Sequence, residues 1–179
     1  MAFAVGLAAT LSGIALPPTL RLLEDYRTAG AARYVASRFQ RARMEAVRRS
    51  ANVAVRFGAT GEFATYVDGN GNGVLSADIR DGTDPQIGAA ERLELGFSGV
   101  QFGVLPGLPP VDAGGTPPGT DPIHLGASNL ASFTPAGTSS SGSVYVRSER
   151  CQLVVRIYGD TGRTRILRFE ERSRQWRSL

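Results

Sequence analysis

A chain of 179 residues with 42% hydrophobic side chains is long enough for one domain with a buried core. Its single histidine, His124, and single cysteine, Cys151, exclude an intrachain disulfide and supply too few ligands for a zinc centre. No nucleophile motif accompanies them, so we expect a non-enzymatic protein without a small-molecule substrate. All 20 basic residues are arginine. They lie mainly at the two ends of the chain, and the middle is acidic.

Residues 1–20 contain no charged side chain. In a helix that rises about 1.5 Å per residue, roughly 20 apolar residues cross the bilayer core of about 30 Å. A secretory signal peptide would need a basic region before the apolar run, and a buried core helix would show a stripe instead of an all-apolar surface. We therefore expect residues 1–20 to be the membrane-spanning half of a long helix.

The apolar pattern of residues 21–50 predicts the second, amphipathic half of that helix. Val35, Phe39, Ala42 and Ala46 recur at helical spacing and form one apolar stripe. We expect this stripe to pack on a sheet of the same chain, with the arginines of the adjoining face in solvent.

Residues 51–179 predict a β-rich head. Apolar alternation in residues 52–57 and 62–67, with a Gly-rich turn between them, predicts a hairpin. Residues 93–97 also alternate and predict a strand, whereas the Pro- and Gly-rich residues 105–122 predict a surface loop. The clearest strands are expected to form an antiparallel meander: 143–147, 152–158 and 163–169.

The stretch that begins at Asp68 fits the first half of an EF-hand loop, D-x-N-x-N-G. Oxygen ligands two residues apart can converge on one cation, and Gly73 permits a sharp turn. The predicted calcium ligands are Asp68, Asn70, Asn72, Val74 and Asp78. The twelfth position, where a bidentate glutamate is expected, holds Ile79. A loop in which Asp and Asn side chains bind their own backbone is therefore the alternative. No other cofactor is expected.

The C-terminal residues combine arginine with aromatic side chains. Arg163 and Arg165 lie two residues apart on a predicted strand, so they are expected on the same face about 6.6 Å apart. Arginine forks and aromatic faces suit contacts with phosphates and stacked bases. The candidate DNA-binding residues are Arg163, Arg165, Arg168, Arg172, Arg174 and Arg177. The alternative is a solvated strand edge in which acidic neighbours pair with part of this charge.

Short motifs recur in a characteristic order along the chain. Ala15-Leu16-Pro17 ends the apolar run, and Arg-Ala-Arg-Met-Glu-Ala-Val-Arg follows at 41–48. The C-terminal half contains Phe-Thr-Pro-Ala-Gly at 133–137, Gly-Ser-Val-Tyr-Val at 142–146 and Tyr-Gly-Asp-Thr-Gly-Arg at 158–163. In these motifs the chain resembles the type IV pilin-like proteins, and within them the GspH/FimT minor pseudopilins.

This resemblance implies an α+β, pilin-like fold, in which a long N-terminal α-helix packs on a C-terminal antiparallel β-rich head. It implies a subunit that helps to assemble or cap a type II secretion pseudopilus or a type IV pilus, with other pilin-like subunits as partners through the helix. The location would be the inner membrane, with a single-pass helix and a periplasmic head. The Gly-Arg-x-Arg sequence at 162–165 also resembles the tail of FimT-type minor pilins. DNA binding during natural transformation is therefore the alternative function.

Members of this family begin with a basic leader and Gly-Phe-Thr-Leu-x-Glu, which a prepilin peptidase cuts before the new N-terminus is methylated. Counting back from Pro17, the glutamate of this motif would fall immediately before Met1. We therefore expect the leader, the methylated phenylalanine and the glutamate to lie upstream of Met1 in the full protein.

Overall fold

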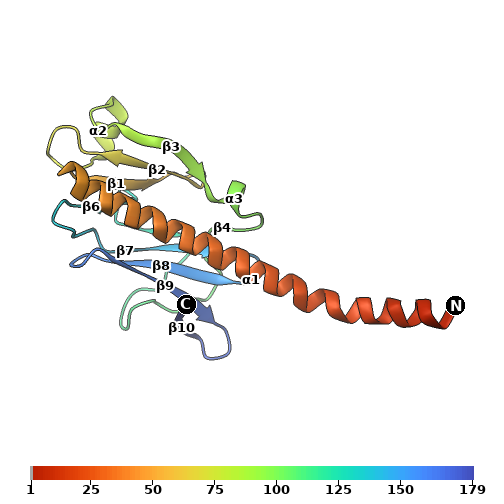
Figure 1. Cartoon of the computed structure of the whole chain (residues 1–179). Helices are drawn as coiled ribbons and strands as arrows, with labels where there is room; N and C mark the ends of the chain where they lie inside the picture. The colour runs from red at the N-terminus through yellow and green to blue at the C-terminus, as the bar shows by residue number, and fades with distance from the viewer. Residues whose placement is uncertain (1) are drawn as a thin grey trace.

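The computed structural model describes residues 2–179, with side chains for residues 21–179. Helix α1 spans Ala2–Arg49, and its 48 residues correspond to about 72 Å at 1.5 Å per residue. Its C-terminal half lies along the head, and its N-terminal half projects beyond it (Figure 1). The predicted membrane-spanning side chains, 1–20, lie outside the residues whose side chains are described. Among the residues that the structure describes, no helix has the length and apolar character needed to cross a membrane.

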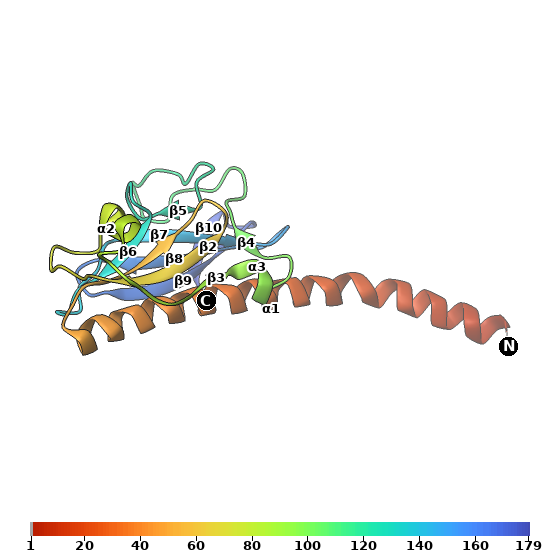
Figure 2. The same cartoon turned by 90° about the horizontal axis from the view of Figure 1, so that it is seen from above.

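The head consists of two antiparallel sheets that lie on one side of α1 (Figure 2). The four-stranded sheet has the order β3-β2-β1-β6. The six-stranded sheet has the order β10-β9-β8-β7-β4, with β5 also paired to β7. The strands of the first sheet are β1 (Val53–Phe57), β2 (Glu62–Val67), β3 (Gln86–Arg92) and β6 (Leu130–Phe133). The strands of the second are β4 (Gln101–Phe102), β5 (Ile123–His124), β7 (Gly142–Arg147), β8 (Gln152–Tyr158), β9 (Arg163–Glu170) and β10 (Gln175–Ser178).

The apolar stripe of α1 is buried, as its helical spacing predicted. Val35, Phe39, Ala42 and Ala46 are each at most 1% exposed and belong to one core cluster with residues of both sheets. The ring of Phe39 packs against the rings of Phe57 on β1 and Phe133 on β6, with centroids 6.0 and 6.1 Å apart. The helix therefore supplies the apolar surface against which both sheets pack.

The predicted hairpin and meander are also confirmed. Strands β1 and β2 pair antiparallel, and so do β7 with β8 and β8 with β9. Val144 of β7 and Val155 of β8 are fully buried in the core shared with α1. Tyr145 and Arg156 alternate with them and therefore lie on the opposite, outer face of the six-stranded sheet.

The strand predicted at residues 93–97 was wrong. This segment contains the short helix α3 (Leu93–Gly96), in which Leu93 is buried and Leu95 is 86% exposed. The N–H of Phe97 donates to the carbonyl of Leu93, and its ring packs on Tyr34 of α1. Apolar residues at 93 and 97 are one helical turn apart, so the same pattern fits a helix that is held by α1.

Three further elements were absent from the sequence prediction. Helix α2 (Ser76–Asp81) begins inside the predicted calcium loop and extends beyond it, and β3 follows as an edge strand. Strand β10 pairs with β9 and lies in the C-terminal stretch of arginine and aromatic residues. The sequence of β3, QIGAAER, has small residues and no alternation of apolar side chains, so it carries no local strand signal.

The predicted surface loop at 105–122 has no regular structure, but it contacts the outer face of the six-stranded sheet. Asp112 pairs with Arg156 of β8 at 2.6 Å. The indole N–H of Trp176 on β10 donates to the carbonyl of Pro109 at 3.1 Å. Leu108 is buried. The loop therefore covers part of the sheet face that points away from α1.

Candidate interaction surfaces

The loop predicted to bind calcium is organised around the carboxylate of Asp68. One of its oxygens accepts the N–H groups of Asn70 and Gly71 at 3.2 and 2.7 Å. The other accepts the N–H of Gly73 at 2.8 Å and the side-chain amide of Asn52 at 3.0 Å. Burial alone would raise the pKa of Asp68, but these hydrogen bonds outweigh it and lower the pKa below its ordinary value.

The other predicted ligands take part in the same hydrogen-bonded loop. The side-chain amides of Asn70 and Asn72 both donate to one oxygen of Asp78, each at 3.0 Å. Val74 is buried beside Ala54. The described residues contain no group of three or more His, Cys, Asp or Glu side chains arranged to hold a metal ion. The loop geometry therefore matches the alternative of Asp and Asn side chains bound to their own backbone, and calcium binding stays a prediction.

Sequence reasoning missed a second acidic residue that fixes this loop, Asp84. The residue is 1% exposed, and its carboxylate accepts the N–H of Gly69 at 3.0 Å and the N–H of Leu75 at 2.9 Å. Through main-chain donors, Asp84 thus joins the two ends of the loop, and Asp68 holds the residues between them. Asp84 belongs to no sequence motif of fixed spacing. Its hydrogen-bond donors, the N–H groups of residues 69 and 75, come close to it only when the turn has folded.

The structure divides the candidate DNA-binding arginines between two faces of the six-stranded sheet. Arg163 and Arg165 are exposed and lie on the same face of β9, as predicted. Arg168 lies on the opposite face, next to α1, and pairs with Asp25 of that helix at 2.6 Å. The bond to Asp25 raises the pKa of Arg168. Because side chains alternate along a strand, β9 places Arg168 on the face opposite to Arg163 and Arg165.

The remaining arginines of the tail are bound locally or lie in a turn. Arg177 pairs with Glu170 across the β9–β10 hairpin at 2.9 Å. Arg174 donates to the carbonyl of Gly107 at 2.8 Å, and Arg172 is exposed in the turn. The six arginines therefore do not form one surface. Arg163 and Arg165 are the pair that the structure brings together on an exposed face.

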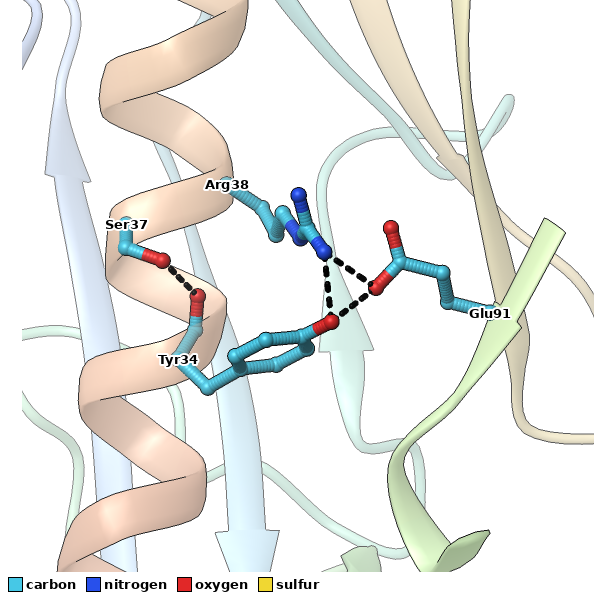
Figure 3. Close-up of polar contacts among 4 residues, drawn as sticks. All are labelled: Tyr34, Ser37, Arg38 and Glu91. Atoms are coloured by element: carbon cyan, nitrogen blue, oxygen red, sulfur yellow. Dashed lines mark hydrogen bonds and ion pairs between the residues drawn. The ribbon is translucent and has the colours of Figure 1, made fainter. Parts of the chain in front are cut away.

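A polar cluster joins α1 to the edge strand β3 (Figure 3). Arg38 of α1 donates to the hydroxyl of Tyr34 and to the carboxylate of Glu91 on β3, the latter at 2.8 Å. The Tyr34 hydroxyl donates to the same carboxylate oxygen. Burial lowers the pKa of Arg38, but the bonds to Tyr34 and Glu91 outweigh this effect and raise it, so the guanidinium stays charged. The cluster fixes the free edge of the four-stranded sheet to the helix.

The side of α1 that does not pack on the head carries apolar and basic residues. Leu22, Tyr26, Met44 and Val47 are 58, 72, 67 and 54% exposed, respectively. Exposed arginines, including Arg33 and Arg41, lie among them. A long helix with one buried face and one exposed apolar and basic face is suited to packing against another protein or a membrane surface.

The single histidine and cysteine make structural contacts. The His124 ring packs against Tyr145, and its Nε2 lies 3.1 Å from the carbonyl oxygen of Pro118. Cys151 is buried, and burial raises the pKa of its thiol to about 12, so it stays protonated at neutral pH.

The fold and its surfaces define a protein class in which an extended N-terminal helix carries a two-sheet β head.

Comparison with known proteins identifies the family within this class. The family model described as Type II transport protein GspH matches residues 31–162. The chain therefore belongs to the GspH family. A solved structure, the minor pseudopilin EpsH from the Type 2 Secretion System of Vibrio cholerae, is similar to 86% of this chain over 95% of its own length. That similarity has 13% sequence identity and a TM-score of 0.44. No curated protein matches the chain.

Proposed function

We propose that this protein is a minor pseudopilin subunit that helps to assemble or cap a type II secretion pseudopilus or a type IV pilus. Residues 1–20 would anchor it in the inner membrane, and the head would lie in the periplasm. The observation that carries the proposal is the two-sided character of α1. One face closes the core of the head, whereas the opposite face is exposed, carries apolar and basic side chains, and would be available to neighbouring pilin-like subunits.

This function requires no chemistry from the head. The family is structural. The work that we assign to this chain is packing of α1 beside other helices and contact between heads. Met44 and Val47 lie on the exposed face at the head end of α1 and are the side chains expected to touch another subunit.

Site-specific cross-linking in cells tests this proposal. A photoreactive amino acid at Met44 should cross-link the full-length protein to other pilin-like subunits when the complete secretion or pilus system is present. The same probe at Asp160, which is exposed in the β8–β9 turn, serves as the matched surface control. Deletion of the gene should abolish protein secretion or pilus formation, and the lost process identifies the system. Unchanged secretion and piliation, with no cross-link from Met44, would contradict the proposal.

DNA binding is a second candidate function, favoured by the exposed pair Arg163 and Arg165 on one face of β9. Contacts from such a pair would be to phosphates, so binding should be independent of sequence and weakened by salt. On double-stranded DNA, Arg163→Gln with Arg165→Gln should flatten the logarithmic salt dependence by about 1.8, at roughly 0.9 per lost contact.

The matched control removes two exposed arginines elsewhere, Arg33→Gln with Arg41→Gln on α1. If DNA is bound through β9, this control variant should keep the wild-type salt dependence. Weak retention of wild type and both variants, with no dependence on salt, would reject DNA binding and leave the proposal of a structural subunit unaffected.

A further inference from the structure

The segment Arg21–Arg27 of α1 has no net charge in the sequence, RLLEDYR, but the fold separates its charges. Both acidic residues are bound by the head. The carboxylate of Glu24 accepts the N–H of Arg150 at 2.9 Å, and Asp25 pairs with Arg168 at 2.6 Å. The negative charge of this segment is therefore held against the head, next to the β7–β8 turn and β9.

The other side chains of the segment stay exposed. They are two arginines, two leucines and one tyrosine, which we name the collar: Arg21, Leu22, Leu23, Tyr26 and Arg27. Tyr26 is 72% exposed and Leu22 is 58% exposed. Among the described side chains, no acidic partner lies within ion-pair distance of either arginine of the collar. These groups surround the helix: Leu22 and Tyr26 lie one turn apart on one side, whereas Arg21 lies one turn before Glu24 and Asp25, on the side near the head.

The position of the collar along the chain matches the surface of a bilayer. It follows directly after 20 uncharged residues, which as a helix would have the length of a bilayer core, about 30 Å. From Arg21 to Arg27 the helix rises about 9 Å, which is comparable to one headgroup layer. Tyrosine is enriched at membrane interfaces, and arginine is attracted to anionic lipid surfaces.

We propose that the collar binds the headgroups of anionic phospholipids and holds the head at the membrane surface before the subunit is assembled. This inference rests on the proposed membrane anchoring of residues 1–20. Capture of Glu24 and Asp25 by the head is part of the site, because two free carboxylates would repel the same lipids. A neighbouring subunit is the competing occupant of the collar.

Fluorescence quenching in vesicles tests the collar. The full chain carries Tyr26→Trp in a Trp176→Phe background, which leaves position 26 as the single tryptophan. It is reconstituted in phosphatidylcholine vesicles, with or without phosphatidylglycerol, that contain lipids brominated near the headgroup. Quenching should be greater with phosphatidylglycerol, and added salt should remove the difference because it screens surface charge.

Charge variants identify the groups responsible. Arg21→Gln with Arg27→Gln in the same tryptophan background should abolish the difference between the two lipid compositions. Arg163→Gln with Arg165→Gln removes the same charge from β9 and should preserve it. Equal quenching in both vesicle types would overturn the proposal. So would a blue shift that depends on protein concentration and is the same in both lipids, because it would assign the collar to a neighbouring subunit.

Flotation of the same vesicles separates this inference from the proposed anchoring. Protein that floats with the vesicles after a carbonate wash, but shows no greater quenching with phosphatidylglycerol, would support the membrane anchor and overturn the proposal for the collar. Protein that floats with neither vesicle type would overturn the anchor and the collar together.

Discussion

At the scale of single residues, Phe39 is the largest fully buried side chain that α1 contributes to the core. It is fully buried and contacts aromatic rings from the four-stranded sheet. Phe39→Ala should lower the free energy of unfolding by about 3–5 kcal/mol, because it removes buried apolar surface and leaves a cavity. Met44→Ala on the same helix is the control and should cost about 0.5 kcal/mol or less, since Met44 is 67% exposed. Urea unfolding measures both, and equal small losses would contradict the assigned core.

Asp68 is the residue whose ionisation should contribute most clearly to stability. Burial would raise the pKa of Asp68, but its hydrogen bonds lower it below the ordinary value of 3.8, so the charged form stabilises the fold above that pH. The stabilisation should be lost as pH falls through the lower pKa of the folded protein. At about pH 7, Asp68→Asn should reduce the free energy of unfolding by roughly 1.5–3 kcal/mol, because charge-assisted hydrogen bonds are lost.

The difference between wild type and Asp68→Asn should shrink as the pH falls below about 4, where the unfolded carboxyl is protonated. Asp160→Asn, at an exposed position, is the control and should have little effect at any pH. A difference that is constant over the whole pH range would contradict the role of the Asp68 charge.

Calcium added to chelator-stripped protein should raise Tm only if the predicted site binds it, and Asp68→Ala should then remove the rise.

At the scale of elements, Arg43 of α1 lies against two turns that close different parts of the head. A Cβ built on Gly162 would lie 2.5 Å from the carbonyl oxygen of Gly137 and 3.0 Å from Nε of Arg43. Gly162 also has a φ of 59°, which most side chains disfavour. The Phe-Thr-Pro-Ala-Gly and Tyr-Gly-Asp-Thr-Gly-Arg motifs thus meet at one arginine of the helix motif.

Gly162→Ala should therefore destabilise the protein more than Gly61→Ala. Gly61 has a φ of 77° but no atom within 4 Å of the added Cβ, so its substitution causes backbone strain alone, about 1–2 kcal/mol. Gly162→Ala adds a clash with main chain and should cost about 3 kcal/mol or more. Thermal unfolding of the two variants compares these effects. Equal losses of stability would show that Arg43 and the turn at 137 can move to accept the methyl group.

At the scale of the whole molecule, both sheets and α1 share one core cluster, so the head should unfold as a unit. The cluster includes Val55 from the four-stranded sheet, Val155 from the six-stranded sheet and Phe39 from the helix. Trp176, the single tryptophan, reports on the six-stranded sheet, whereas far-ultraviolet circular dichroism reports on all elements. The two signals should give the same midpoint, and Phe39→Ala should shift both equally. Separate midpoints would show that the sheets unfold independently.

The sequence predicted the elements in which local periodicity is strong. The stripe from Val35 to Ala46 and the alternation from Val53 to Phe57 each repeat with the period of their element, so their buried faces could be assigned. Strand β3 and helix α3 could not be predicted, because they are held by Glu91 and Phe97 contacts with α1 rather than by their own pattern. The sequence revealed the residues of the calcium motif and of the arginine-rich C-terminal stretch. It did not reveal which hydrogen bonds and ion pairs these residues make.

What the sequence by itself determined is the plan of the molecule, a long helix with a buried stripe followed by a β-rich head, because side-chain periods of 3.6 and 2 are properties of adjacent residues. The tertiary structure alone decided which charges are free. It binds Asp25 to Arg168 and Glu24 to the backbone of Arg150, although more than 100 residues separate each pair along the chain. Ion pairing acts over a few ångströms in space, so only the folded chain could hold Glu24 and Asp25 against the head while Arg21, Tyr26 and Arg27 stay exposed.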